Sequence, residues 1–203
     1  MNLLSAVKSG FRNYAVFSGR APRAAFWKFA LFILLALVAA TVINSLIFGP
    51  EVRDTVTWSV NGSGDTNVHT ARNVTYDGGW LSGLVMVAVL VPYLAVAWRR
   101  MHDTGRSGWW VFLPLPIMVV VYTALWFFSK EVPLDPAAFQ QGLKLPEGFK
   151  PPTSVRVPDL SPWAFVTLFA LSFGSAALVI FWLARASQPG PNRYGPNPLE
   201  VTP

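Results

Sequence analysis

Four long stretches of the 203-residue chain contain no Asp, Glu, Lys or Arg, and they constrain the fold more than any other feature. They are residues 29–50, 78–98, 107–129 and 160–184, with lengths of 22, 21, 23 and 25 residues. A helix needs about 20 mostly apolar residues to cross the roughly 30 Å hydrocarbon core of a bilayer. Because lipid offers no hydrogen-bond partner for the backbone, such segments are expected to be helical. The sequence therefore predicts an all-α membrane protein with four transmembrane helices.

We expect one membrane domain over residues 1–203, with helices at about 22–48, 79–98, 108–128 and 162–184. A soluble helical protein is disfavoured because only 13% of the residues are charged, whereas a soluble domain carries about 25%. A β-barrel is disfavoured because the four stretches do not alternate between apolar and polar residues, as barrel strands do.

The basic residues are distributed unevenly between the two sides that four crossings define. Segments 1–28, 99–106 and 185–203 carry ten Lys/Arg and two acidic residues, a net charge of +8. Segments 51–77 and 130–159 carry six Lys/Arg and eight acidic residues, a net charge of −2. Since Lys and Arg accumulate on the cytoplasmic side, we expect an N-in/C-in topology. The basic segments adjoin the membrane, which favours anionic lipid headgroups over nucleic acid as their counter-charge.

The segments outside the four helices differ in character. Residues 1–18 place apolar side chains at helical spacing and predict an amphipathic helix at the membrane surface, with a frayed terminus as the alternative. The outer segment 49–78 has β-branched residues on both sides of a turn at 61–65, which predicts a small extracytoplasmic hairpin. The second outer segment, 129–161, is rich in proline and predicts an irregular connector. Pro114 and Pro116 predict a kink or break in the third helix.

The residues required for common kinds of catalysis do not form a recognisable group. The chain has no cysteine, and its two histidines, His69 and His102, fall on opposite sides of the predicted membrane. A thiolate or histidine metal site is therefore not expected. Ser107 lies in a Gly-Arg-Ser-Gly sequence, but Trp109 occupies the position where a nucleophile elbow needs glycine. We expect no enzymatic activity and no cofactor.

Transport is the main alternative function. Ion-coupled carriers usually place ionisable residues inside their helices, and the four stretches contain none. Their interior polar residues are Thr41, Asn44, Ser82, Tyr93, Thr123, Ser172 and Ser175. A small-solute channel or transporter, including an oligomeric one, stays open as an alternative.

Three polar motifs gather on the predicted cytoplasmic side: FSGRAPRAAFW from residue 17, WRRMHDTGRSGWW from residue 98 and NRYGPNP from residue 192. Their candidate interaction or structural residues are Gly19, Arg20, Arg23, Trp27, Arg99, Arg100, His102, Asp103, Gly105, Arg106, Ser107, Trp109, Trp110, Arg193 and Tyr194. In this order, and with helices between them, the motifs resemble the domain-of-unknown-function 805 family of small bacterial inner-membrane proteins. The resemblance implies a multi-pass protein of the bacterial inner membrane and implies no particular activity.

The middle motif is expected to form a tight turn between the second and third helices, which would then run as an antiparallel hairpin. We expect Asp103 to pair with Arg100, Arg106 or an arginine of another motif. Asp103, Thr104 or Ser107 is expected to cap the helix that follows.

The sequence thus favours an integral membrane protein whose arginine-rich cytoplasmic face contacts anionic lipid or a protein partner, including a second copy of the chain. The simplest interpretation is that the arginines only fix the topology and meet lipid phosphates.

Overall fold

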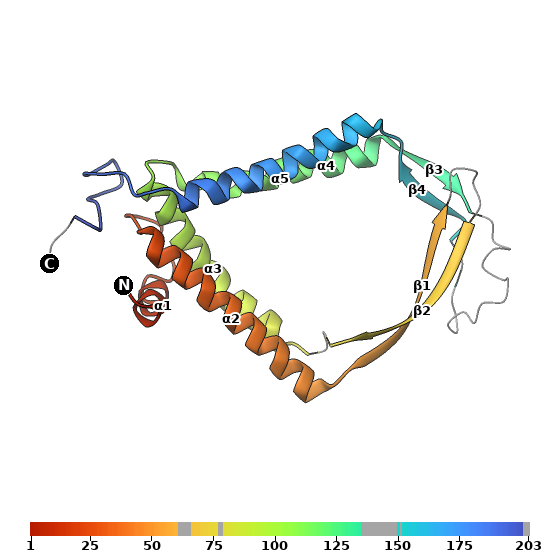
Figure 1. Cartoon of the computed structure of the whole chain (residues 1–203), viewed down its shortest axis with the longest axis horizontal. Helices are drawn as coiled ribbons and strands as arrows, with labels where there is room; N and C mark the ends of the chain where they lie inside the picture. The colour runs from red at the N-terminus through yellow and green to blue at the C-terminus, as the bar shows by residue number, and fades with distance from the viewer. Residues whose placement is uncertain (61–65, 77–78, 135–149, 151, 201–203) are drawn as a thin grey trace.

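The computed structural model describes residues 1–60, 66–76, 79–134, 150 and 152–200. Figure 1 labels the elements in chain order. They are α1 (Leu3–Arg12), α2 (Arg23–Phe48), β1 (Glu51–Val60), β2 (Thr66–Thr75), α3 (Leu81–Asp103), the 3₁₀ helix η1 (Gly108–Phe112), α4 (Pro114–Phe127), β3 (Ser129–Pro133), β4 (Ser154–Pro158) and α5 (Pro162–Ala184). The turn predicted at 61–65 and the middle of the second outer segment lie outside the described residues.

Four helical segments are long and apolar enough to cross a membrane, which confirms the expected number. They are α2, α3, α5 and the continuous run Gly108–Phe127 formed by η1 and α4. The observed bounds of α2 and α5 lie within one residue of the predicted 22–48 and 162–184. This agreement arises because the ends of both helices fall where charged or helix-breaking residues begin.

The second predicted helix ends later than expected. We predicted 79–98, whereas α3 continues to Asp103 and takes up five of the eight residues of segment 99–106. No residue between Arg99 and Asp103 breaks a helix, and the first such residue is Gly105, which has a φ of +78°. Charged residues at the end of the span therefore belong to the last turn of a helix.

The third span is divided, as its prolines predict. Residues Gly108–Phe112 form a 3₁₀ turn, and α4 begins at Pro114. Proline is well tolerated in the first turn of a helix because its missing N–H would have no intrahelical partner there. The break therefore lies at the start of α4.

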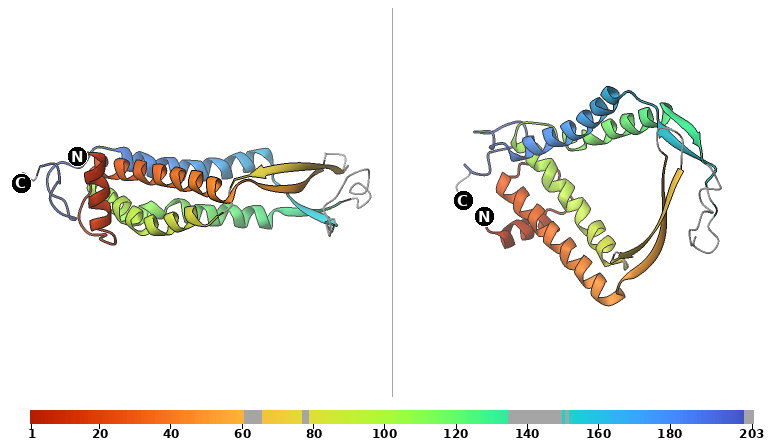
Figure 2. Two further views of the ribbon diagram at one scale, coloured as in Figure 1. Left: turned by 90° about the horizontal axis from the view of Figure 1, so that it is seen from below. Right: turned by 45° about the vertical axis from the view of Figure 1, so that its right-hand side comes forward.

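The four spanning helices form two pairs that diverge from one end of the molecule (Figures 1 and 2). Helix α2 packs along α3, and α4 packs along α5. The predicted antiparallel hairpin of the second and third helices is therefore wrong, because α3 and α4 separate beyond the turn that joins them. Lipid chains are as apolar as helix side chains, so the exposed faces of α4 need no second helix to cover them.

Two antiparallel hairpins occupy the other end of the molecule (Figure 1). Strands β1 and β2 pair from Glu51↔Thr75 to Val60↔Thr66, which confirms the hairpin expected within 49–78. Strands β3 and β4 also pair, from Ser129↔Pro158 to Pro133↔Ser154, so 129–161 is not irregular throughout. Val132 lies opposite Val155, and the two prolines fall at the strand ends, where a missing N–H is tolerated.

Helix α1 packs across the outside of α2. Asn2 caps its start by accepting a hydrogen bond from the Ser5 N–H at 2.8 Å. Gly10 is buried against the ring of Phe29, and Phe11 contacts the same ring edge-on with centroids 5.7 Å apart. The amphipathic helix predicted within 1–18 is therefore present but shorter, and part of its apolar side packs against α2.

The packed core lies where the two helix pairs meet. It consists of Phe26, Phe29, Val96, Ala97, Met101, Val179 and Leu183, contributed by α2, α3 and α5. This core holds the ends of three helices together directly beneath the polar motifs.

Candidate functional site

The three polar motifs meet at the end of the molecule that carries both chain termini (Figure 1). We call this end the basic face and define it as residues 1–28, 99–110 and 185–200. Helix α3 brings Arg100, His102 and Asp103 to it on one turn, while the segments before α2 and after α5 approach from either side. Motifs that lie more than 80 positions apart in the sequence thus form one contact network.

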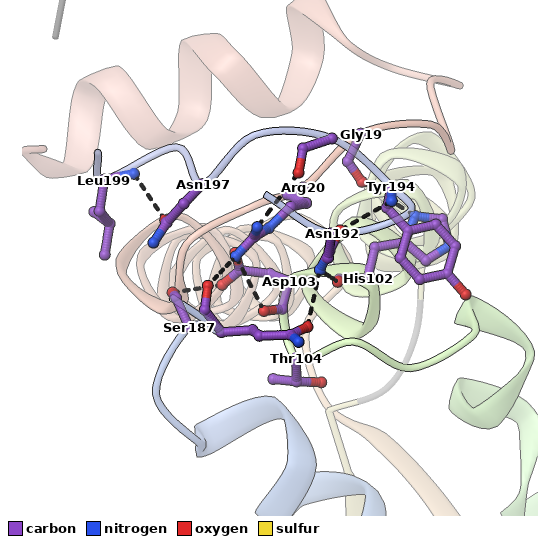
Figure 3. A network of polar contacts seen from close by, with 12 residues as sticks. Gly19, Arg20, His102, Asp103, Thr104, Ser187, Asn192, Tyr194, Asn197 and Leu199 are labelled. Atoms are coloured by element: carbon purple, nitrogen blue, oxygen red, sulfur yellow. Dashed lines mark hydrogen bonds and ion pairs between the residues drawn. The ribbon is translucent and has the colours of Figure 1, made fainter. Parts of the chain in front are cut away.

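Asp103 is the centre of this network, and its side chain is fully buried. Its carboxylate accepts hydrogen bonds from Arg20 Nε at 3.0 Å, from Ser187 Oγ at 2.5 Å and from the Arg100 guanidinium. Figure 3 shows Arg20 and Ser187 directed at this carboxylate. A buried charge is strongly unfavourable unless it is paired and hydrogen-bonded, and Asp103 meets both conditions. The expected pairing of Asp103 with an arginine is observed, with Arg20 and Arg100 as partners.

Arg20 joins the carboxylate to the segment that follows α5. Its guanidinium donates to the carbonyl oxygens of Gln188 at 2.6 Å and Gly190 at 2.8 Å. The backbone N–H of Gln188 in turn donates to the Asp103 carbonyl at 2.9 Å. One side chain near the N-terminus therefore holds the C-terminal segment against the end of α3.

Arg100 fixes the end of α5. Its Nε donates to the Leu183 carbonyl at 2.9 Å, and another of its nitrogens donates to the Arg185 carbonyl. The last carbonyls of a helix have no intrahelical donor and carry partial negative charge. A guanidinium at this position donates hydrogen bonds to these carbonyls and offsets their partial negative charge, while it also neutralises Asp103.

His102 and Tyr194 form a second contact between α3 and the C-terminal segment. Their rings are stacked with centroids 3.7 Å apart and an angle of 3° between their planes. His102 Nδ1 lies 3.1 Å from the Gly19 carbonyl oxygen, and Asn192 Nδ2 donates to the His102 carbonyl at 3.0 Å. Arg193 covers the Tyr194 ring at 4.7 Å. Stacking and hydrogen bonds therefore order the NRYG segment on the basic face.

Beside the network lies an open polar pocket of about 650 Å³. It is formed by Thr104, Gly105, Arg106, Arg185, Ala186, Ser187, Gln188 and Pro189. Arg106 stacks over the Trp182 ring at 4.8 Å and donates to the Thr104 carbonyl at 3.3 Å. Partial burial, followed by the nearby charge of Arg185, lowers the pKa of Arg106. The pocket therefore brings two positive charges close together.

The structure brings together only some of the predicted site residues. Gly19, Arg20, Arg100, His102, Asp103 and Tyr194 belong to the network, while Gly105 and Arg106 line the adjacent pocket. Arg23, Trp27, Trp109 and Trp110 are exposed at the helix starts, and Arg99 donates only to the Ala95 carbonyl of its own helix among its described contacts.

The predicted cap of the third span is wrong. Ser107 precedes η1 without a side-chain capping bond, Thr104 donates back to the Met101 carbonyl, and Asp103 is used by the network.

Three residues of the C-terminal segment were missed: Arg185, Ser187 and Gln188. Asn192, which donates to the His102 carbonyl, begins the predicted NRYGPNP motif. Gln188 contributes to Arg20 mainly through its backbone carbonyl, which every residue type possesses. The one signal for this segment in the sequence is the polar run SQPGPNR, which follows the last apolar stretch. Among the described residues, no group of three His, Cys, Asp or Glu side chains could hold a metal ion.

These features define a multi-pass membrane protein with four candidate spans, in which a buried ion-pair network ties the segment before α2 to the ends of α3 and α5. The chain belongs to the family described as "Protein of unknown function (DUF805)", which matches residues 14–141. It is 32% identical to the inner membrane protein YhaI of Escherichia coli K12 over 125 residues, which are 61% of this chain and 81% of the relative. It is 30% identical to the E. coli K12 inner membrane protein YhaH over 102 residues, 50% of this chain and 65% of the relative. No solved structure matches the chain significantly.

Proposed function

We propose that the protein lies in the inner membrane with both termini in the cytoplasm, and that its basic face binds anionic phospholipid headgroups. The carrying observation is a set of exposed basic side chains that the network leaves unused. They are Lys8, Arg12, Arg23, Arg185 and Arg193. None of them has a carboxylate within ion-pair distance among the described residues.

The contrast with the opposite end supports this assignment. Arg72, Lys130 and Arg156 at the hairpin end each pair with an acidic neighbour, at 3.0–3.2 Å. Basic side chains near an anionic membrane surface contribute about 1 kcal/mol each to lipid association. Five unpaired ones on a single face therefore supply a substantial attraction.

Exposed aromatic side chains mark the same face. Trp27, Trp109 and Trp110 lie at its helix starts with 44%, 70% and 46% of their surfaces exposed. Tryptophan is favoured at the depth of the headgroups, where its ring is apolar and its N–H can bond to polar groups. These rings support the placement of the basic face at a membrane interface.

The contacts of the interior polar residues give less support to the transport alternative. Asn44 donates to Ser82 Oγ at 3.0 Å, which joins α2 to α3, and Ser172 donates to the Leu168 carbonyl at 3.0 Å. The Asn44–Ser82 bond stabilises the packing of α2 on α3, and the Ser172 hydroxyl is satisfied by the backbone of its own helix. A protein partner or a second copy at the basic face is a competing occupant that the experiment below distinguishes.

The test measures which lipids remain bound after extraction from liposomes of phosphatidylglycerol and phosphatidylethanolamine. We expect native mass spectrometry to show enrichment of phosphatidylglycerol, and Lys8→Gln/Arg12→Gln/Arg23→Gln to reduce that enrichment. Arg72→Gln/Lys130→Gln/Arg156→Gln is the control, because it removes the same charge from the opposite end. Equal enrichment in both triple variants, or protein in place of lipid on the wild-type chain, would contradict the proposal.

Topology is tested separately with reporter fusions. A reporter that works only in the cytoplasm is expected to be active when it is fused after residue 203. A reporter that works only outside the cytoplasm is expected to be active when it is inserted at 61–65. The opposite result would reverse the assignment of the two faces.

A further inference from the structure

Arg99 carries a buried positive charge that no carboxylate of the described residues neutralises. Only 9% of its surface is exposed, and none of the ion pairs among the described residues includes it. Arginine is seldom buried without a partner, because a buried charge without a counter-charge is strongly unfavourable. A group from outside the described chain is therefore needed to neutralise it.

The acidic side chains of the basic face are already engaged. Of the ten acidic residues in the chain, only Asp103 and Glu200 lie in the segments that form this face. Asp103 is held by two other arginines. Glu200 accepts hydrogen bonds from the Gly190 N–H at 3.1 Å and from Asn197 Nδ2 at 2.7 Å. The basic face thus offers Arg99 no free carboxylate among its described residues.

One hydrogen bond fixes the direction of the Arg99 side chain. Its Nε donates to the Ala95 carbonyl oxygen at 3.2 Å, so the side chain lies back along α3, as helical side chains usually do. Its two terminal nitrogens form no hydrogen bond among the described contacts. Across the described residues, Asn44 Oδ1 is the one fully buried side-chain polar atom without a partner. The terminal nitrogens of Arg99 therefore reach the molecular surface, while the rest of the side chain is enclosed.

Contacts with the start of α2 indicate the depth of this guanidinium. The Arg99 carbonyl accepts a hydrogen bond from the Ala21 N–H at 3.0 Å, two residues before α2 begins at Arg23. The guanidinium bonds one turn further along α3, about 6 Å away at 1.5 Å per residue. On α2 the uncharged stretch starts at Phe29, about 9 Å from Arg23 by the same rise. Because α2 and α3 pack side by side, the guanidinium lies on the headgroup side of the apolar span.

The free end of this side chain is suited to a phosphate. Guanidinium groups form directional, often bidentate hydrogen bonds with phosphate oxygens. At headgroup depth the surrounding anions are the phosphates of phospholipids. A zwitterionic lipid would also bring an ammonium group, which finds no free carboxylate among the described residues of this face. An anionic lipid therefore neutralises Arg99 without leaving a second charge unpaired.

We infer that the Arg99 guanidinium binds the phosphate of one anionic phospholipid beside the start of α2. This inference rests on the proposed function, because it requires the basic face to lie at an anionic membrane surface. It goes further by assigning one phosphate to one buried side chain, whereas the exposed basic residues attract many lipids without a fixed site.

The experiment follows thermal unfolding of the full chain in neutral-detergent micelles with increasing phosphatidylglycerol or phosphatidylethanolamine. We expect phosphatidylglycerol to raise the wild-type midpoint more, since a ligand that binds only the folded state stabilises it. Arg99→Met removes the charge and keeps an unbranched side chain. In detergent alone it should unfold at the wild-type temperature or higher, because a buried charge without a counter-charge is lost. Half-maximal stabilisation should then need about tenfold more phosphatidylglycerol.

Three variants separate lipid binding from a structural role. Arg12→Gln is the matched control, because it removes one exposed charge from the same face and should respond to phosphatidylglycerol nearly as the wild type does. Arg99→Lys keeps the charge and should recover part of the response. Arg100→Met should lower the midpoint in every lipid, because Arg100 pairs with Asp103. If Arg99→Met likewise unfolds earlier in detergent alone, or fails to fold, Arg99 has a structural role and the inference is wrong.

The remaining outcomes identify the source of the phosphate and separate the inference from the proposed function. If sodium phosphate stabilises the wild-type chain as much as phosphatidylglycerol does, and Arg99→Met abolishes both effects, the ligand is a soluble anion and the inference is wrong. If Arg99→Met keeps the full response to phosphatidylglycerol, the inference is wrong and the proposed function stands. If the wild-type chain shows no preference for phosphatidylglycerol, both are wrong.

Discussion

Asp103→Asn should separate the C-terminal segment from the helices with little change in side-chain shape. The wild-type carboxylate binds Arg20 and Arg100, and all three side chains are at most 1% exposed. The amide removes the negative charge and leaves two buried guanidinium groups near one another. Removal of one partner from a buried ion pair costs about 3–5 kcal/mol. Because both arginines retain bonds to backbone carbonyls, we expect a loss of about 4 kcal/mol, the middle of that range.

This loss can be measured by unfolding in mixed micelles with increasing sodium dodecyl sulfate. The nine tryptophans supply a fluorescence signal. A loss of about 4 kcal/mol lowers the ratio of folded to unfolded protein nearly a thousandfold. Trypsin cleavage after Arg193 provides an independent readout, since the network holds that segment in place. We expect cleavage to be much faster in the variant.

The control is Asp54→Asn, which breaks an ion pair with Arg72 at 3.1 Å between exposed side chains. Exposed pairs contribute about 0–1 kcal/mol, so this variant should be nearly unchanged. A loss for Asp103→Asn no larger than that of the control, together with unchanged cleavage after Arg193, would refute the argument that the buried carboxylate holds the basic face together.

Two further substitutions test the turn and the stacked segment. Gly105→Val should lower the free energy of unfolding by about 1–3 kcal/mol, because Gly105 has a φ of +78° and a Cβ there would lie 2.6 Å from Gln188 Oε1. Gly83→Ala is the control, since its Cβ position is open and the free energy of unfolding should not fall. Equal losses in the two variants would contradict the reason given. Tyr194→Ala should speed hydrogen exchange in residues 188–198 because the stack on His102 is lost. Tyr76→Ala is the control, because it removes an exposed ring elsewhere. If exchange in residues 188–198 is equally slow in both variants, the stack does not order the segment.

The spans could be predicted because charge is excluded from hydrocarbon, so uncharged stretches mark where helices cross. The same rule explains why the end of α3 was misplaced. A charged residue normally leaves the membrane interior, and Arg99 was therefore taken as the first residue beyond the helix. Arg100 and Asp103 instead neutralise each other within one helical turn, which allows the helix to continue to Asp103. A count of uncharged residues cannot show whether two charged residues pair with each other.

The site could be predicted only at the level of its motifs. Polar residues that cluster on one predicted side identify Arg20 and Asp103 as neighbours in space, although 83 positions separate them. The partners that complete the site are mostly backbone carbonyls, at Leu183, Gln188 and Gly190. Carbonyls carry no residue-type signal, so no pattern in the sequence could have indicated them.

Arg100 connects the buried network to the end of α5, since it binds both the Asp103 carboxylate and the Arg185 carbonyl. Asp103→Asn should therefore lower stability without releasing the end of α5, because Arg100 keeps its bonds to the Leu183 and Arg185 carbonyls. Arg106→Gln/Arg185→Gln should leave the cleavage rate after Arg193 unchanged, because neither side chain bonds to Asp103 among the described contacts. This difference distinguishes the arginines that hold the network together from the arginines that line the pocket beside it. If the pocket variant also exposed Arg193 to trypsin, the two sets of arginines would form a single structural unit, and the division of roles argued above would be wrong.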